Sequence, residues 1–66
     1  MIPPQEKPVV KLTGRDGNAF AIMGRVKQAL RRNGADEEYI QKYLNEATSG
    51  DYNNLLAVSM NYVEVV

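Results

Sequence analysis

The sequence contains no cysteine and no histidine among its 66 residues. Without cysteine the chain forms no disulfide and has no thiol nucleophile. Without histidine it lacks the side chain that ordinarily titrates near neutral pH, and a zinc site would have to be built from carboxylates alone. We therefore predict that the protein is not an enzyme and that it has no catalytic residues, no metal site and no cofactor.

The chain also lacks an excess of charge of either sign. Eight Lys and Arg residues balance eight Asp and Glu residues, so no global field steers the protein toward nucleic acid or an anionic membrane. No apolar run approaches the length of a membrane span. The stretch Met1–Pro4 lacks the basic and apolar blocks of a secretory signal. We expect no membrane association and a cytoplasmic location.

Proline is confined to the first eight residues of the chain. Because proline fixes its own φ and disfavours helix in the residue before it, residues 1–8 are predicted to form a flexible, Pro-rich arm. Residues 9–66 are predicted to form a single small helical domain, since so short a chain holds one core at most. Within it, Val9–Thr13 is β-branched and predicts a strand without an obvious partner strand in the chain.

Three apolar stripes with helical spacing follow this strand. The first helix is predicted from about Ala19 to Asn33, the second from the N-cap Asp36 to Gly50, and the third from Asp51 toward the C-terminus. The connections are short, so consecutive helices should be neighbours. The predicted fold is mostly α, a compact three-helix bundle preceded by an extended or single-strand N-terminal arm.

Small residues mark further features of the helices and turns. Gly24 lies inside the first predicted helix, where glycine costs about 1 kcal/mol relative to alanine, and we expect another part of the backbone to approach closely there. Ser59 lies in the apolar stripe of the third helix and indicates the close approach of another helix. The segment Gly14–Asn18 is predicted to be a turn with an N-cap, and its alternative role is to bind an anion at a helix N-terminus.

Two segments resemble known families. The stretch Leu12–Phe20, with the pattern LTG-x-DGNAF, and the block Ala47–Tyr52 resemble a family of short uncharacterised proteins of bacteria and their phages. This resemblance implies a phage or mobile-element setting and no assigned activity. The turn Gly50–Asp51 is similar to one in ubiquitin-associated-like three-helix domains, although Asn33–Ala35 lacks the apolar anchors of their first loop. That likeness implies a similar bundle topology, and fold alone does not carry function.

The leading functional hypothesis is a non-enzymatic protein-interaction accessory module of a phage, a mobile element or a bacterial host. Tyrosine is favoured at protein interfaces, and an unpaired strand can add to a partner's sheet or to a second copy of the chain. The unpaired strand also predicts a homodimer through the N-terminal segment. The candidate partner contacts are Val10, Leu12, Tyr39 and Tyr43.

The alternative hypothesis is a small nucleic-acid-binding factor. Basic residues recur along the first predicted helix, and one more lies in the turn before it. A local cluster of this kind can bind phosphates even when the net charge is zero. The candidate residues are Arg15, Arg25, Lys27, Arg31 and Arg32.

Overall fold

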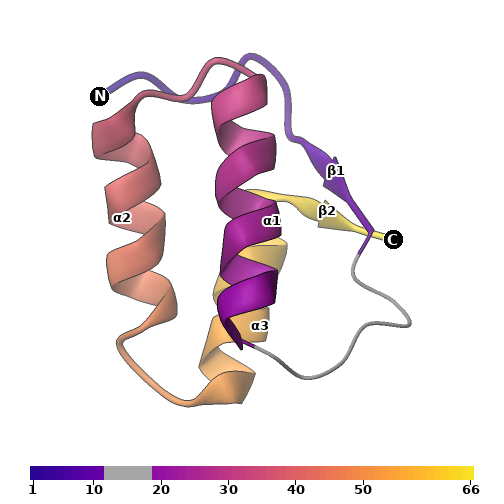
Figure 1. Ribbon diagram of the computed structural model, residues 1–66, viewed down its shortest axis with the longest axis vertical. Helices are drawn as coiled ribbons and strands as arrows, with labels where there is room; N and C mark the ends of the chain where they lie inside the picture. Colours follow the sequence, from indigo (N-terminus) through magenta and orange to yellow (C-terminus); the bar gives the residue numbers. More distant parts are fainter. Residues whose placement is uncertain (12–18) are drawn as a thin grey trace.

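The computed structural model describes residues 1–11 and 19–66. Its elements are β1 (Val9–Val10), α1 (Ala19–Arg32), α2 (Glu37–Ala47), α3 (Tyr52–Tyr62) and β2 (Glu64–Val65). Consecutive helices run in opposite directions, and the two strands lie on the side of α1 away from α2 (Figure 1). The predicted mostly α, three-helix architecture is confirmed. In the described part of the chain, no helix is long and apolar enough to cross a membrane.

Helices α2 and α3 each begin directly after an aspartate that caps them, and Asp36 is the cap predicted for α2. The Tyr39 backbone N–H donates to the Asp36 carboxylate over 2.9 Å, and this hydrogen bond lowers the pKa of the Asp36 carboxyl. The Asn54 backbone N–H donates in the same way to Asp51 over 2.9 Å. Each aspartate therefore satisfies an amide that has no partner within its helix.

The first two helices end close to the predicted positions. Gly34, with φ of +97°, lies two residues after the end of α1 and adopts the left-handed conformation that glycine tolerates best. The second helix ends at Ala47, three residues before the predicted end, because the Thr48 hydroxyl donates to the Leu44 carbonyl over 2.7 Å. Gly50 instead allows α3 to start nearby, since a Cβ at Gly50 would lie 2.9 Å from the Asn54 Cβ.

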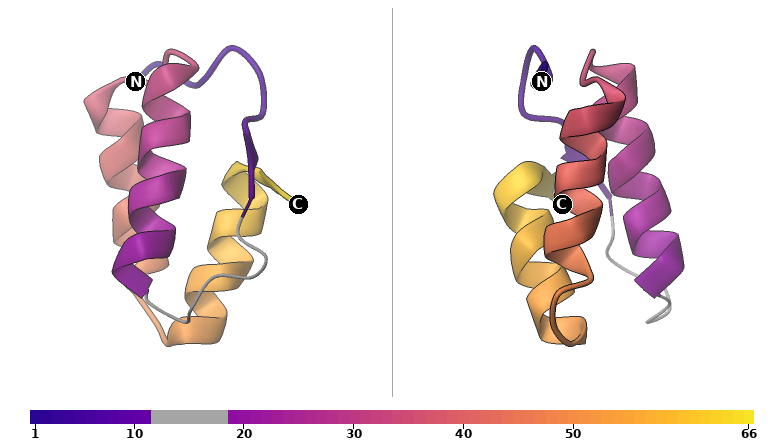
Figure 2. Two further views of the ribbon diagram at one scale, coloured as in Figure 1. Left: turned by 45° about the vertical axis from the view of Figure 1, so that its right-hand side comes forward. Right: turned by 90° about the vertical axis from the view of Figure 1, so that its left-hand side faces the viewer.

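The N-terminal strand has a partner within the chain, so the prediction that it is unpaired is wrong. Strand β1 pairs in parallel with β2, with Val9 opposite Glu64. The Glu64 N–H donates to the Pro8 carbonyl over 2.7 Å, and the Val66 N–H donates to the Val10 carbonyl over 3.0 Å. Figure 2 shows the two strands together near the C-terminal end of α3. The predicted homodimer through this segment therefore loses its basis.

Residues 1–8 are in contact with the helices rather than forming a separate arm. The Gln5 N–H donates to the Asn33 carbonyl over 2.8 Å, and the Asp36 N–H donates to the Ile2 carbonyl over 3.1 Å. Pro8 is buried. The segment crosses the connection between α1 and α2 (Figure 1), and it supplies partners for backbone groups that the helices leave unpaired.

The core lies between the three helices and under β1. Each helix buries three side chains along one face, as the apolar stripes predict, and residues flanking the helices complete the core. The buried residues are Val10, Ile22, Val26, Leu30, Ala35, Ile40, Tyr43, Ala47, Leu55, Ser59, Tyr62 and Val63.

A buried polar contact joins α2 to α3. The hydroxyls of Tyr43 and Ser59 lie 2.7 Å apart, and both side chains have an exposed fraction of 0%. Their hydrogen bond confirms that Ser59 marks the close approach of another helix. The Tyr62 ring packs edge-on against Tyr43, with ring centroids 5.1 Å apart, and against Tyr39 at 5.5 Å. Aromatic pairs of this geometry add about 0.5–1.5 kcal/mol beyond the area they bury.

The Tyr43–Ser59 hydrogen bond gives a first prediction about stability. Either Tyr43→Phe or Ser59→Ala leaves one buried hydroxyl without a partner, and each should lower the free energy of unfolding by about 1–3 kcal/mol. The double variant removes both hydroxyls, so its loss should be smaller than the sum of the two single losses. Urea unfolding followed by circular dichroism measures all three variants. Strictly additive losses would contradict the pairing.

Burial raises the pKa of both the Tyr43 and the Tyr62 hydroxyls, which gives a prediction about pH. A raised pKa in the folded state means that the unfolded chain releases these protons first. The free energy of unfolding should therefore be unaffected by these groups below about pH 10, the ordinary tyrosine pKa, and should fall as the pH rises above it. Urea unfolding across this pH range measures the slope. The Tyr43→Phe/Ser59→Ala variant should show a shallower fall, and an identical fall would contradict the assignment.

Candidate functional site

A groove runs between α1 and α2 on the surface of the bundle, with a volume of about 420 Å³. Helix α1 contributes four residues, and α2 contributes three together with its C-cap Thr48. Both sets are spaced at i, i+3, i+4 and i+7, which places each along one helix face. We call this feature the α1–α2 groove. Its lining residues are Phe20, Met23, Gly24, Lys27, Gln41, Leu44, Asn45 and Thr48.

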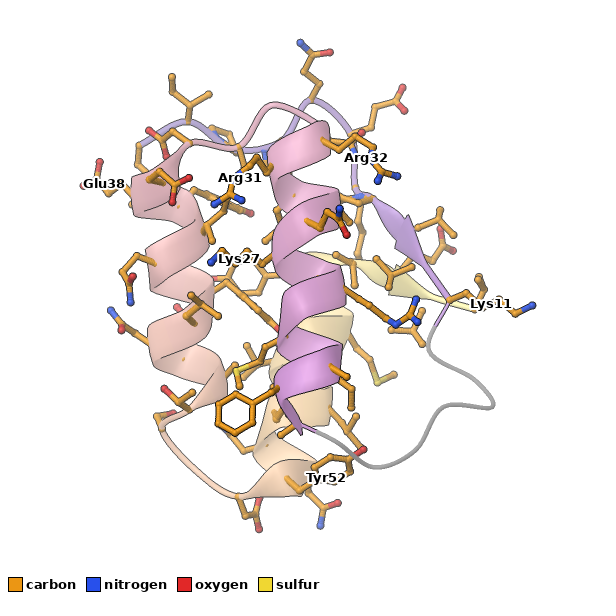
Figure 3. The ribbon with its side chains drawn as sticks, in the orientation of Figure 1. Lys11, Lys27, Arg31, Arg32, Glu38 and Tyr52 are labelled. Carbon is orange, nitrogen blue, oxygen red and sulfur yellow. The ribbon has the colours of Figure 1, made fainter. Side chains whose placement is uncertain are left out.

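The centre of the α1–α2 groove is apolar and its rim is polar. Met23 and Leu44 are partly buried, and both pack against the core. Phe20 stands at one end with 81% of its surface exposed. Lys27 is the one charged residue among the described residues that line the groove. Its side chain points between α1 and α2 (Figure 3).

Gly24 forms part of this groove, and the predicted close approach of backbone at Gly24 is wrong. A Cβ built at this position meets no atom within 4 Å, and the residue is exposed. Packing within the described part of the chain therefore does not require a glycine here. The glycine instead keeps this part of the groove open, at a cost of about 1 kcal/mol in helix propensity.

A second hollow of about 260 Å³ adjoins the α1–α2 groove and shares Met23 and Thr48 with it. It lies at the end of the bundle where α2 leads into α3. Leu55 forms its buried side, and Tyr52 lies beside it with 40% of its surface exposed. Figure 3 places Tyr52 at the start of α3. The two hollows together extend the apolar surface from α1 to α3.

The predicted partner contacts lie mostly outside this surface. Val10 and Tyr43 are buried in the core, with exposed fractions of 6% and 0%, so neither side chain forms part of this surface. Tyr39 is partly buried and packs against Tyr62. Leu12 lies outside the described residues. The sequence did contain a sign of the groove, because Gly24 is unusual in a helix.

A second groove, of about 220 Å³, lies between β1 and α1. We call it the β1–α1 groove. One side of the groove is formed by β1 and the residue after it, and the other side by the face of α1 that carries residues 25, 28, 29 and 32. Its lining residues are Val9, Val10, Lys11, Arg25, Gln28, Ala29 and Arg32.

The basic residues of α1 are divided between two sides of the helix. Arg25 and Arg32 line the β1–α1 groove, where Lys11 joins them from β1. Lys27 lines the α1–α2 groove, on the opposite side. Arg31 donates from both Nε and Nη2 to the Glu37 carboxylate, at 3.1 and 2.7 Å. Figure 3 shows this separation, with Lys11 and Arg32 on the strand side of α1.

The five residues predicted for nucleic acid therefore do not form one patch. Arg25 and Arg32 lie together, whereas Lys27 and Arg31 are on another side of the helix, and the charge of Arg31 is compensated by Glu37. Arg15 lies outside the described residues, as does the predicted Gly14–Asn18 turn. Sequence analysis missed Lys11, since only the pairing of β1 with β2 holds it beside α1.

Few of the described side chains lie in surroundings that would support catalysis or metal binding. Among residues 1–11 and 19–66, no group of three or more aspartate or glutamate residues could hold a metal ion. Glu46 is the acceptor for the Tyr62 hydroxyl at 3.0 Å, and its other oxygen lies 3.7 Å from the Lys42 ammonium. The Tyr62 hydroxyl and the Glu46 carboxylate raise the pKa of Lys42. This contact ties α2 to the end of α3.

Comparisons with models of protein families, with curated proteins and with solved structures found no match to this chain. The resemblance to short proteins of bacteria and phages therefore stays a prediction. The functional argument depends on the two grooves.

Proposed function

We propose that this domain is a non-enzymatic protein-interaction module that binds an amphipathic helix of a partner protein in the α1–α2 groove. The observation that carries the proposal is the pair of matching stripes that two antiparallel helices contribute to this groove. Each stripe covers seven residue steps, from 20 to 27 and from 41 to 48. At 1.5 Å per residue this is about 10 Å, or two turns of a docked helix.

The chemistry of the α1–α2 groove supports a protein partner. An apolar centre surrounded by polar side chains is the usual anatomy of a protein interface. Phe20, with 81% of its surface exposed, provides an aromatic side chain at the end of the groove. Aromatic residues often contribute a large share of binding energy at such positions.

The charge of the groove specifies the partner further. Lys27 is the single described charge along its lining and lies opposite Gln41, at the end away from Phe20. A complementary helix therefore has apolar side chains facing Met23 and Leu44 and a carboxylate near Lys27. The open space at Gly24 lets the partner's backbone come close to α1.

The Gly24→Ala variant tests whether the space beside Gly24 is open, through its effect on the free energy of unfolding. A Cβ at this position projects into open space, so nothing in the described fold opposes it. The substitution should raise the free energy of unfolding by about 0.5–1 kcal/mol, because alanine favours the helix. Thermal and urea unfolding measure the change. A destabilised variant would show that Gly24 has a structural role that the described contacts lack.

Gly24→Leu tests binding at the same position. Its larger side chain fills the α1–α2 groove while leucine still favours the helix over glycine, so the protein should remain folded and lose its partner. The measurement is affinity capture of a nuclease-treated lysate of the native host, with photo-crosslinking from position 41 to establish where the partner lies. Capture of a protein that crosslinks in the groove, and loss of that protein with Gly24→Leu, is the expected result.

Ala57→Leu is the matched control, because Ala57 is an exposed alanine of α3 outside the α1–α2 groove. It adds a similar apolar surface and should leave capture unchanged. The proposal is wrong if Gly24→Leu captures the same proteins as the wild type, or if both leucine variants lose them equally.

A further inference from the structure

All of the charged residues among the described lining residues of the β1–α1 groove are positive. Lys11 lies at the end of β1, and Arg25 and Arg32 lie two helical turns apart on α1. Their positions differ by seven residues, which corresponds to about 10 Å along the helix. Gln28 lies between them and adds a neutral hydrogen-bonding side chain.

In the described part of the chain, no carboxylate lies within ion-pairing distance of these three cations. The ion pairs within residues 1–11 and 19–66 involve the N-terminal amino group, Arg31 and Lys42, and none includes Lys11, Arg25 or Arg32. Arg31 makes the contrast clear, since its guanidinium lies 2.7 Å from Glu37. Like charges gathered along a groove attract a polyanion and repel one another in its absence.

We propose that the β1–α1 groove binds the phosphate backbone of single-stranded nucleic acid. Guanidinium groups suit phosphate oxygens because they donate two parallel hydrogen bonds. Two of them about 10 Å apart on one face of α1 suit an extended chain of phosphates better than one small anion. Lys11 adds a flexible cation at the end of β1, with its side chain directed away from α1 (Figure 3). Val9, with 60% of its surface exposed, offers apolar contact to a sugar or a base.

The groove depends on a contact between distant parts of the chain. Lys11 follows β1, and β1 is held beside α1 by its hydrogen bonds to β2. The site is therefore a property of the folded domain, and a peptide containing α1 alone lacks the third cation. It also lies on the side of α1 away from the α1–α2 groove, so the two proposals are tested by different variants.

The first experiment measures fluorescence anisotropy of a labelled, mixed-sequence single-stranded DNA of about 16 nucleotides. The expected dissociation constant lies between about 10⁻⁶ and 10⁻⁴ M, the usual range for sequence-independent binding. Three phosphate contacts predict a slope of about −2 for the logarithm of the association constant against that of salt concentration. Affinity should therefore fall roughly 20-fold between about 50 and about 200 mM NaCl.

Two double variants that remove equal charge from the same helix distinguish a site from general attraction. Arg25→Gln/Arg32→Gln should weaken binding at low salt by at least about tenfold and reduce the slope to about −0.7. Lys27→Gln/Arg31→Gln is the matched control and should weaken binding less than about threefold, because its charges are farther from the bound strand and are screened. All four residues are at the surface, and circular dichroism verifies that both variants fold.

A ¹⁵N–¹H correlation spectrum recorded with the same oligonucleotide locates the contact. The amide shifts of residues 9–11 and 25–32 should move together, while those around Leu44 should not. Four results would overturn the proposal: no binding at millimolar protein, binding that ignores salt, equal losses in the two double variants, or equal affinity for a polyglutamate peptide. The last would show attraction to any polyanion rather than recognition of phosphate.

Discussion

The hydrogen bond between Tyr43 and Ser59 fixes how α2 and α3 pack, and other parts of the structure follow from it. Tyr43 is the largest fully buried side chain, and a buried hydroxyl without a partner is costly. The small Ser59 side chain on α3 leaves room for the Tyr43 ring, and the Ser59 hydroxyl is the hydrogen-bond partner of the Tyr43 hydroxyl. Since Ser59 is one turn before the end of α3, this contact also fixes where Tyr62 and Val63 lie. Val63 then leads the chain away from the helix, fully buried and extended, toward β2.

Much of the helical architecture could be predicted from local patterns. The sequence identifies Asp36 as an N-cap and Asp51 as the start of the third helix. The apolar stripes also indicate most of the side chains that the helices bury, although Tyr52 is exposed. The strand pair could not be predicted in this way. Each strand has two residues, and the valine-rich segment from Tyr62 to Val66 is too short to distinguish helix from strand by periodicity. Its assignment depends on pairing with a segment at the other end of the described chain.

The surface was harder to predict than the core, for a physical reason. Tyr43 belongs to an apolar stripe, yet tyrosine is common both in cores and at interfaces, and only the position of Ser59 determines its burial. Gly24 was recognised as unusual, but whether a helical glycine packs or lies open depends on the neighbouring helix. The surroundings of the basic residues of α1 likewise depend on the neighbouring elements. Their number is evident from the sequence, whereas their division between two grooves depends on how β1 and α2 flank the helix.

The parallel pairing of β1 with β2 has a consequence for how the protein is made. Helices form from contacts that are local in sequence, within microseconds. The strand pair instead joins residues 9 and 10 to residues 64 and 65, so it closes a loop that contains all three helices. During synthesis β1 leaves the ribosome before the helices, whereas its partner β2 emerges only after α3. The helices can therefore assemble on the nascent chain, whereas β1 and β2 can pair only after the segment that follows α3 has been translated.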